Sequence, residues 1–117
     1  MRDLKSNEWF LVPMQCYHRT TQEKARSILE NGFLDGEGKF LTDRIWRGVW
    51  VSNRPLDSNE GAEGDVLLEI RIPESEVTPF EWVEEGKPYR EFLVPARILN
   101  DKGIVVLRQS SIPRRVL

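Results

Sequence analysis

The sequence has very few of the residues from which disulfides and zinc sites are built. Its 117 residues include one cysteine, Cys16, and one histidine, His18. A single cysteine excludes an internal disulfide and is compatible with a reducing compartment. One cysteine and one histidine are also too few for a zinc site made of Cys and His ligands, so we expect no bound metal.

Long apolar runs and a strong net charge are missing as well. No segment approaches the roughly 20 apolar residues needed to span a bilayer, and the N-terminal MRDLKSNEWF has no long apolar stretch. We therefore expect a cytoplasmic protein without a membrane partner. The net charge of −2 gives no global electrostatic attraction to nucleic acid. The length predicts a single domain over residues 1–117, with loosely held ends at 1–7 and 110–117.

Two motifs of nucleotide-binding and hydrolytic enzymes are absent. Gly36 and Gly38 are not followed by the Gly-Lys-Ser/Thr of a P-loop, so GEGKF predicts a turn. There is no G-x-S-x-G elbow, and the pattern around Cys16 and His18 offers no third orienting group for a Cys/His hydrolase. These classes of enzyme are therefore not indicated.

The apolar pattern predicts one helix followed by several strands. A capping-box pattern of Thr20 with Glu23 precedes a helix over residues 21–31, which Gly32 would end. Pro13 suggests that the first strand lies at an edge or carries a bulge. Residues 33–44 and 53–65 are expected to be loops, and strands are predicted at 8–17, 48–52, 66–72, 81–83, 90–95 and 103–108. One main helix without βαβ alternation predicts an α+β fold.

Three residues at the exposed edges of predicted strands could carry chemistry: His18, Trp50 and Glu91. Each also has a purely structural interpretation. The histidine can be a surface or capped core residue, the tryptophan can fill the core, and the glutamate can be a solvated carboxylate. Taken singly, each is better explained structurally, and only their joint order along the chain favours a functional interpretation.

That order resembles the ADP-ribosyltransferase superfamily, especially its diphtheria-toxin and poly(ADP-ribose) polymerase side with a His-Tyr-Glu triad. YHRT at 17–20 is similar to the family's strand ending in His-x-Thr, and KARSILENGF at 24–33 to the helix that follows it. RGVWVS at 47–52 resembles the strand with the aromatic member, and YREFLVPARIL at 89–99 resembles the strand with the glutamate. The resemblance covers about residues 17–107 and implies a split β-sheet with an NAD cleft between its parts.

The resemblance implies a role for each matching residue. His18 would hydrogen-bond the adenosine-side ribose of NAD. Arg19 stands where a glycine holds the nicotinamide amide through its backbone, and Thr20 matches the family threonine. Trp50 replaces the tyrosine that stacks near nicotinamide, and Glu91 matches the catalytic glutamate.

Four further residues are weaker candidates. Ser52 follows Trp50 on the same face of its strand and would also contact NAD. Arg44 and Arg47, together with Arg19, would bind the pyrophosphate, since guanidinium groups pair with phosphate oxygens. Tyr89, in the turn VEEGKPY, would meet the acceptor. Solvent-exposed arginines and a solvated turn are the alternatives for these positions.

The implied activity is transfer of ADP-ribose from NAD, which is the substrate, to an unidentified acceptor that could be a protein, a nucleic acid or a small molecule. Glu91 would stabilise the oxocarbenium-like charge on the ribose. Two alternatives remain open. One is an RNA 2'-phosphotransferase of the same fold, which normally carries an additional basic N-terminal lobe that residues 1–16 are not expected to form. The other is a catalytically silent binding module.

Overall fold

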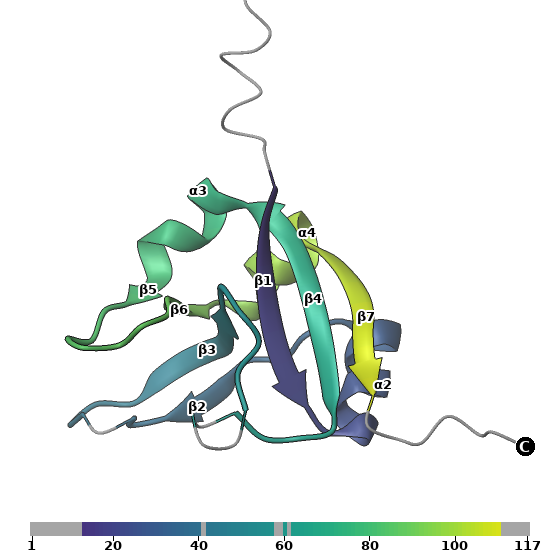
Figure 1. Cartoon of the computed structure of the whole chain (residues 1–117), viewed down its shortest axis with the longest axis horizontal. Coiled ribbons are helices and arrows are strands. Elements are labelled where there is room, and N and C mark those ends of the chain that lie inside the picture. Colours follow the sequence, from purple (N-terminus) through teal and green to yellow (C-terminus); the bar gives the residue numbers. More distant parts are fainter. Residues whose placement is uncertain (1–12, 41, 58–59, 61, 111–117) are drawn as a thin grey trace, which may run out of the picture.

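A seven-stranded antiparallel sheet organises the protein (Figure 1). The computed structural model describes residues 13–40, 42–57, 60 and 62–110. In chain order its elements are β1 Pro13–Thr20, α2 Gln22–Asn31, β2 Gly36–Gly38, β3 Trp46–Ser52, β4 Val66–Pro73, α3 Glu74–Val77, the 3₁₀ turn η2 Thr78–Phe80, β5 Glu81–Trp82, β6 Glu91–Val94, α4 Ala96–Lys102 and β7 Ile104–Ser110. The predicted α+β class is confirmed.

The sheet is nearly divided in two between its central strands. The strand order is β5-β6-β3-β1-β4-β7, and β2 adds to β3. β1 pairs with β4 along its whole length, but it pairs with β3 only where Tyr17 faces Ser52. We call β1, β4 and β7 the β1 half, and β2, β3, β5 and β6 the β3 half. Figure 1 shows the β3 half turning away from the long strands of the β1 half.

The helix after β1 forms as predicted, but a different residue caps it. The side chain of Thr21 accepts a hydrogen bond of 3.2 Å from the backbone N–H of Lys24, which makes Thr21 the N-cap. The prediction that Thr20 caps the helix is therefore wrong, because β1 extends to Thr20, which pairs with Val66 and is buried. At the other end Gly32 adopts a φ of 93° and its N–H bonds to the carbonyl of Ile28, as expected of a glycine stop.

The hydrophobic core lies between the sheet and the helices behind it. Alternating residues of the strands face it, together with residues of α4; the fully buried members include Cys16, Val51, Ile70, Ile72, Phe92, Val94 and Leu99. Asn100 of α4 makes two hydrogen bonds to the backbone of Phe33, of 2.7 and 3.0 Å, which fix α4 against the chain that leaves α2.

The predicted strands are found, with three differences. The first strand spans Pro13–Thr20, and residues 8–12 of the prediction lie outside the described residues. β1 is an interior strand of the sheet, but at Pro13 only its β4 side is paired; the β3 side is open there, which is where a proline without an N–H is tolerated. Gly36–Gly38, predicted as a turn, forms β2 because its backbone pairs with Trp46–Gly48.

The prediction of one helix is incomplete. α3 and α4 are also helical, and neither has a side-chain cap at its start. No helix in the described part of the chain is long and apolar enough to cross a membrane. Of the ends predicted to be loosely held, 1–7 and 111–117 lie outside the described residues, and Ser110 is the last residue of β7.

Candidate functional site

A pocket of about 360 Å³ is lined by residues from both halves of the sheet. His18 comes from β1, Trp50 from β3 and Glu91 from β6, so the three candidates that are far apart in the sequence line one cavity. Arg19 and Ser52 line it as well. We call this cavity the central pocket.

His18 is held by the neighbouring strand in one defined tautomer. Its Nδ1 lies 2.7 Å from the main-chain oxygen of Trp50, and its ring meets Phe33 edge to face at 5.6 Å between centroids. Burial lowers the pKa of His18, and the bond to Trp50 offsets this only in part, so the imidazole is neutral at pH 7. Because a carbonyl only accepts, Nδ1 carries the proton and Nε2 keeps a lone pair that can accept from a ligand hydroxyl.

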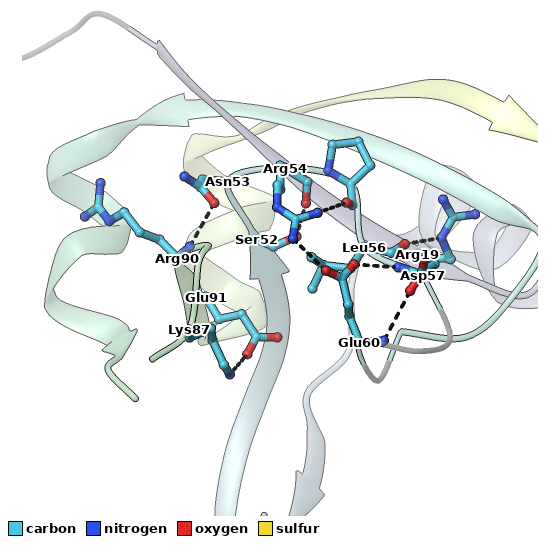
Figure 2. Close-up of polar contacts among 11 residues, drawn as sticks. Arg19, Ser52, Asn53, Arg54, Leu56, Asp57, Glu60, Lys87, Arg90 and Glu91 are labelled. Carbon is cyan, nitrogen blue, oxygen red and sulfur yellow. Dashed lines mark hydrogen bonds and ion pairs between the residues drawn. The ribbon is translucent and has the colours of Figure 1, made fainter. Parts of the chain in front are cut away.

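Arg19 anchors a loop. Its Nε donates a 2.6 Å hydrogen bond to the carbonyl of Leu56, which fixes the loop after β3 against β1 (Figure 2).

Thr20 does not line the central pocket. It lines an adjacent hollow of about 540 Å³, which His18 and Arg19 share and which also includes Lys24 at the start of α2.

Trp50 belongs to an aromatic wall. It meets Phe40 edge to face at 5.0 Å and Trp82 at 5.2 Å between ring centroids, and all three rings line the central pocket. Phe40 has a φ of 48°, a left-handed conformation that is uncommon for a residue with a side chain. Such a conformation persists where surrounding contacts fix it. Here the ring of Phe40 packs against Trp50 and, at 6.3 Å between ring centroids, against Trp82.

Ser52 is at the point where β1, β3 and β6 meet. It is buried, pairs across the sheet with Tyr17 and Glu91, and its hydroxyl donates a 2.6 Å bond to the carbonyl of Arg54. Its hydroxyl therefore shapes the loop after β3. That loop is also held by an ion pair of 2.6 Å between Arg54 and Glu60, drawn in Figure 2.

Glu91 has a partner that the sequence pattern did not indicate. Lys87 Nζ lies 2.6 Å from Glu91 Oε1 and 2.7 Å from Glu84 Oε1. The side chain of Glu91 is only 15% exposed. Figure 2 shows its other oxygen directed away from Lys87, toward the loop that carries Leu56 and Glu60. Both of these residues line the central pocket.

The remaining candidates lie away from the central pocket. The Arg44 guanidinium covers the ring of Trp46 at 3.9 Å, and Arg47 pairs with Glu37 at 3.0 Å. Both arginines line a separate hollow of about 610 Å³. Tyr89 does not line the central pocket either, and its ring lies 4.8 Å from the guanidinium carbon of Arg54.

Sequence reasoning missed several pocket residues: Phe40, Leu56, Glu60, Trp82 and Glu84. No local pattern marks them, because they come from loops and a two-residue strand.

Within the described ranges there is no group of three His, Cys, Asp or Glu side chains that could hold a metal ion. No family model, curated protein or solved structure matches the chain.

Proposed function

We propose that the protein binds NAD⁺ in the central pocket and transfers its ADP-ribose to an acceptor. One observation carries the proposal: His18, Trp50 and Glu91, which come from three different strands, line the same cavity. The resemblance to ADP-ribosyltransferases requires this convergence. The division of the sheet at Tyr17 and Ser52 also fits the split sheet that the resemblance implies.

The charges of the site match those of NAD⁺. The nicotinamide ring is a cation, and the central pocket is lined by aromatic rings and by the carboxylates of Glu60, Glu63, Glu84 and Glu91. The adjacent hollow offers Arg19 and Lys24 beside the N-terminus of α2, where phosphate oxygens are favoured. Asp35 in that hollow already accepts a 2.7 Å bond from the N–H of Ala96.

The pocket residues suit the cleavage of the nicotinamide–ribose bond. When that bond breaks, its electron pair leaves with the nicotinamide nitrogen, and positive charge develops on the ribose. The carboxylate of Glu91 stabilises this charge. The lone pair on Nε2 of His18 accepts from a ribose hydroxyl and helps to fix the dinucleotide. The acceptor then forms a bond to the ribose C1' and releases its proton to solvent.

A second candidate is a catalytically silent module that binds NAD⁺. One observation favours it, the 2.6 Å ion pair between Lys87 and Glu91, because a bound ammonium offsets part of the charge of the carboxylate. The two candidates differ in whether nicotinamide is released.

The test measures binding and release on the same samples. We expect NAD⁺ to raise the melting temperature more than NADH does, because only the oxidised ring is a cation. We expect release of nicotinamide, and Glu91→Gln should lower its rate about 100-fold, the size of effect seen when one group that stabilises the transition state is removed.

Glu85→Gln is the matched control. Glu85 is an exposed carboxylate of the loop that precedes β6, it does not line the central pocket, and its loss should leave release unchanged. Stabilisation by NAD⁺ without nicotinamide release would favour the silent module. No stabilisation by NAD⁺ would contradict both candidates.

A further inference from the structure

The loop between β5 and β6 places one lysine, Lys87, next to two carboxylates that line the central pocket. The N–H of Lys87 donates a 3.4 Å bond to the carbonyl of Glu84, which closes a tight turn. Gly86 within this turn has a φ of 82°, a backbone conformation that favours glycine. The turn thus places Lys87 between two carboxylates that line the pocket, Glu84 and Glu91.

Lys87 is shielded from solvent, and its ammonium group donates to two carboxylates. Its side chain is 17% exposed, and its ammonium contacts Glu84 at 2.7 Å and Glu91 at 2.6 Å. Partial burial would lower the pKa of Lys87, but the hydrogen bonds to the two carboxylates outweigh it and the pKa is raised. Lys87 therefore stays protonated at neutral pH and keeps both bonds.

We propose that Lys87 is a positioning residue, which holds one oxygen of Glu91 so that the other faces the bound ribose. This inference rests on the proposed function. A carboxylate has two oxygens, and Lys87 contacts Oε1. The other oxygen points toward the loop of Leu56 and Glu60, on the opposite wall of the same pocket (Figure 2).

The opposite role would be a lock that withdraws Glu91 from the substrate. The contacts favour positioning for two reasons. One ammonium is shared between two carboxylates, so the group of Glu84, Lys87 and Glu91 keeps a net negative charge toward the pocket. A glutamate side chain that is fixed beforehand also loses less conformational freedom when the transition state forms, which raises turnover more than affinity.

The experiment separates turnover from binding in Lys87→Met and Lys87→Arg. We expect Lys87→Met to lower kcat for nicotinamide release about tenfold or more, with KM and the Kd for NAD⁺ within about twofold of the wild-type values. Lys87→Arg keeps a cationic donor and should recover most of kcat. Lys102→Met, a change at an exposed lysine of α4, is the control and should leave both parameters unchanged. If Lys87→Met fails to fold, Lys87→Gln replaces it.

Each result decides between the alternatives. A higher kcat in Lys87→Met would show that Lys87 is a lock and would overturn the assignment. An unchanged kcat in Lys87→Met would also overturn the assignment, and so would a kcat in Lys87→Arg that stays as low as in Lys87→Met. These outcomes leave the proposed function standing, because the wild-type protein releases nicotinamide in all of them. A wild-type protein that releases none would instead overturn the transfer function, and the assignment of Lys87 with it.

Discussion

The Nδ1 of His18 lies 2.7 Å from the main-chain oxygen of Trp50, and this bond crosses from the β1 half of the sheet to the β3 half. The same imidazole lines the central pocket with its ring. His18 therefore contributes to the fold and to the site at once, and its protonation state should be visible in the stability of the protein.

The first prediction concerns pH. The folded pKa of His18 is lowered by burial, whereas an unfolded histidine titrates near its ordinary value of about 6.5. Below that pH the unfolded chain binds a proton on His18 more readily than the folded protein does. The contribution of His18 to the free energy of unfolding is therefore fully present above about pH 6.5 and declines as the pH falls. Between pH 7.5 and 5.5, urea unfolding should show a smaller loss in the free energy of unfolding for His18→Gln than for the wild type. Equal losses in the two proteins would contradict the assignment.

The second prediction concerns the one cysteine. Burial raises the pKa of the Cys16 thiol to about 11, and its side chain is fully buried in the core. Because the thiolate is the reactive form, a thiol reagent at pH 8 should modify the native protein only at the rate at which unfolding exposes Cys16. Adding urea above the unfolding midpoint should make labelling fast and stoichiometric. Rapid labelling of the native chain would show that Cys16 is accessible.

The third prediction compares two glycines with positive φ. A Cβ on Gly64, whose φ is 119°, would overlap the carbonyl of Thr20 at the end of β1, and backbone cannot move aside cheaply. Gly64→Ala should therefore lower the free energy of unfolding by about 3 kcal/mol or more. A Cβ on Gly86 meets nothing within 4 Å, so Gly86→Ala should cost only the strain of its φ, about 1 kcal/mol. Similar losses, measured by urea unfolding, would contradict the predicted clash.

The fourth prediction concerns a buried carboxylate on β4. Glu69 is 1% exposed and pairs with Arg71 at 2.7 Å and with Arg108 at 3.0 Å, and both arginines are about half exposed. Removing both arginines leaves a buried charge without a partner, which should cost about 3 kcal/mol or more. Glu69→Leu removes the charge itself and lets the arginines return to water, so it should cost less.

The comparison uses the double variant Arg71→Ala/Arg108→Ala and Glu69→Leu in urea unfolding at pH 7. A greater loss in Glu69→Leu than in the double variant would mean that the ion pairs stabilise the fold by more than the burial of Glu69 costs. That result would contradict the prediction.

The strands were predictable because their side chains alternate. Val66, Leu68, Ile70 and Ile72 define one apolar face by sequence alone, and β4 buries all four. Gly36–Gly38 has no such pattern, and only pairing with β3 makes it a strand. α4 has seven residues and no capping side chain, too little to reveal a helical period.

The site was predictable in part, for a related reason. His18, Trp50 and Glu91 lie on regular strands, and the resemblance of these strands to those of ADP-ribosyltransferases implied that the three residues share a pocket. Lys87 lies on a turn, and its contact with Glu91 depends on the fold of that turn. Arg44 was expected at the pocket because guanidinium groups bind phosphate. That affinity does not determine where the side chain points, and Arg44 packs on Trp46 instead.

The sparse pairing between β1 and β3 has a mechanical consequence. In the described part of the chain, Tyr17 with Ser52 is the single backbone register pair across that line, while β1 and β4 share eight such pairs. The sheet is therefore stiff within each half and compliant between them. A ligand that contacts His18 on one side and Glu91 on the other would add a further connection between the two halves. Its binding would slow amide exchange along the line where the sheet is softest.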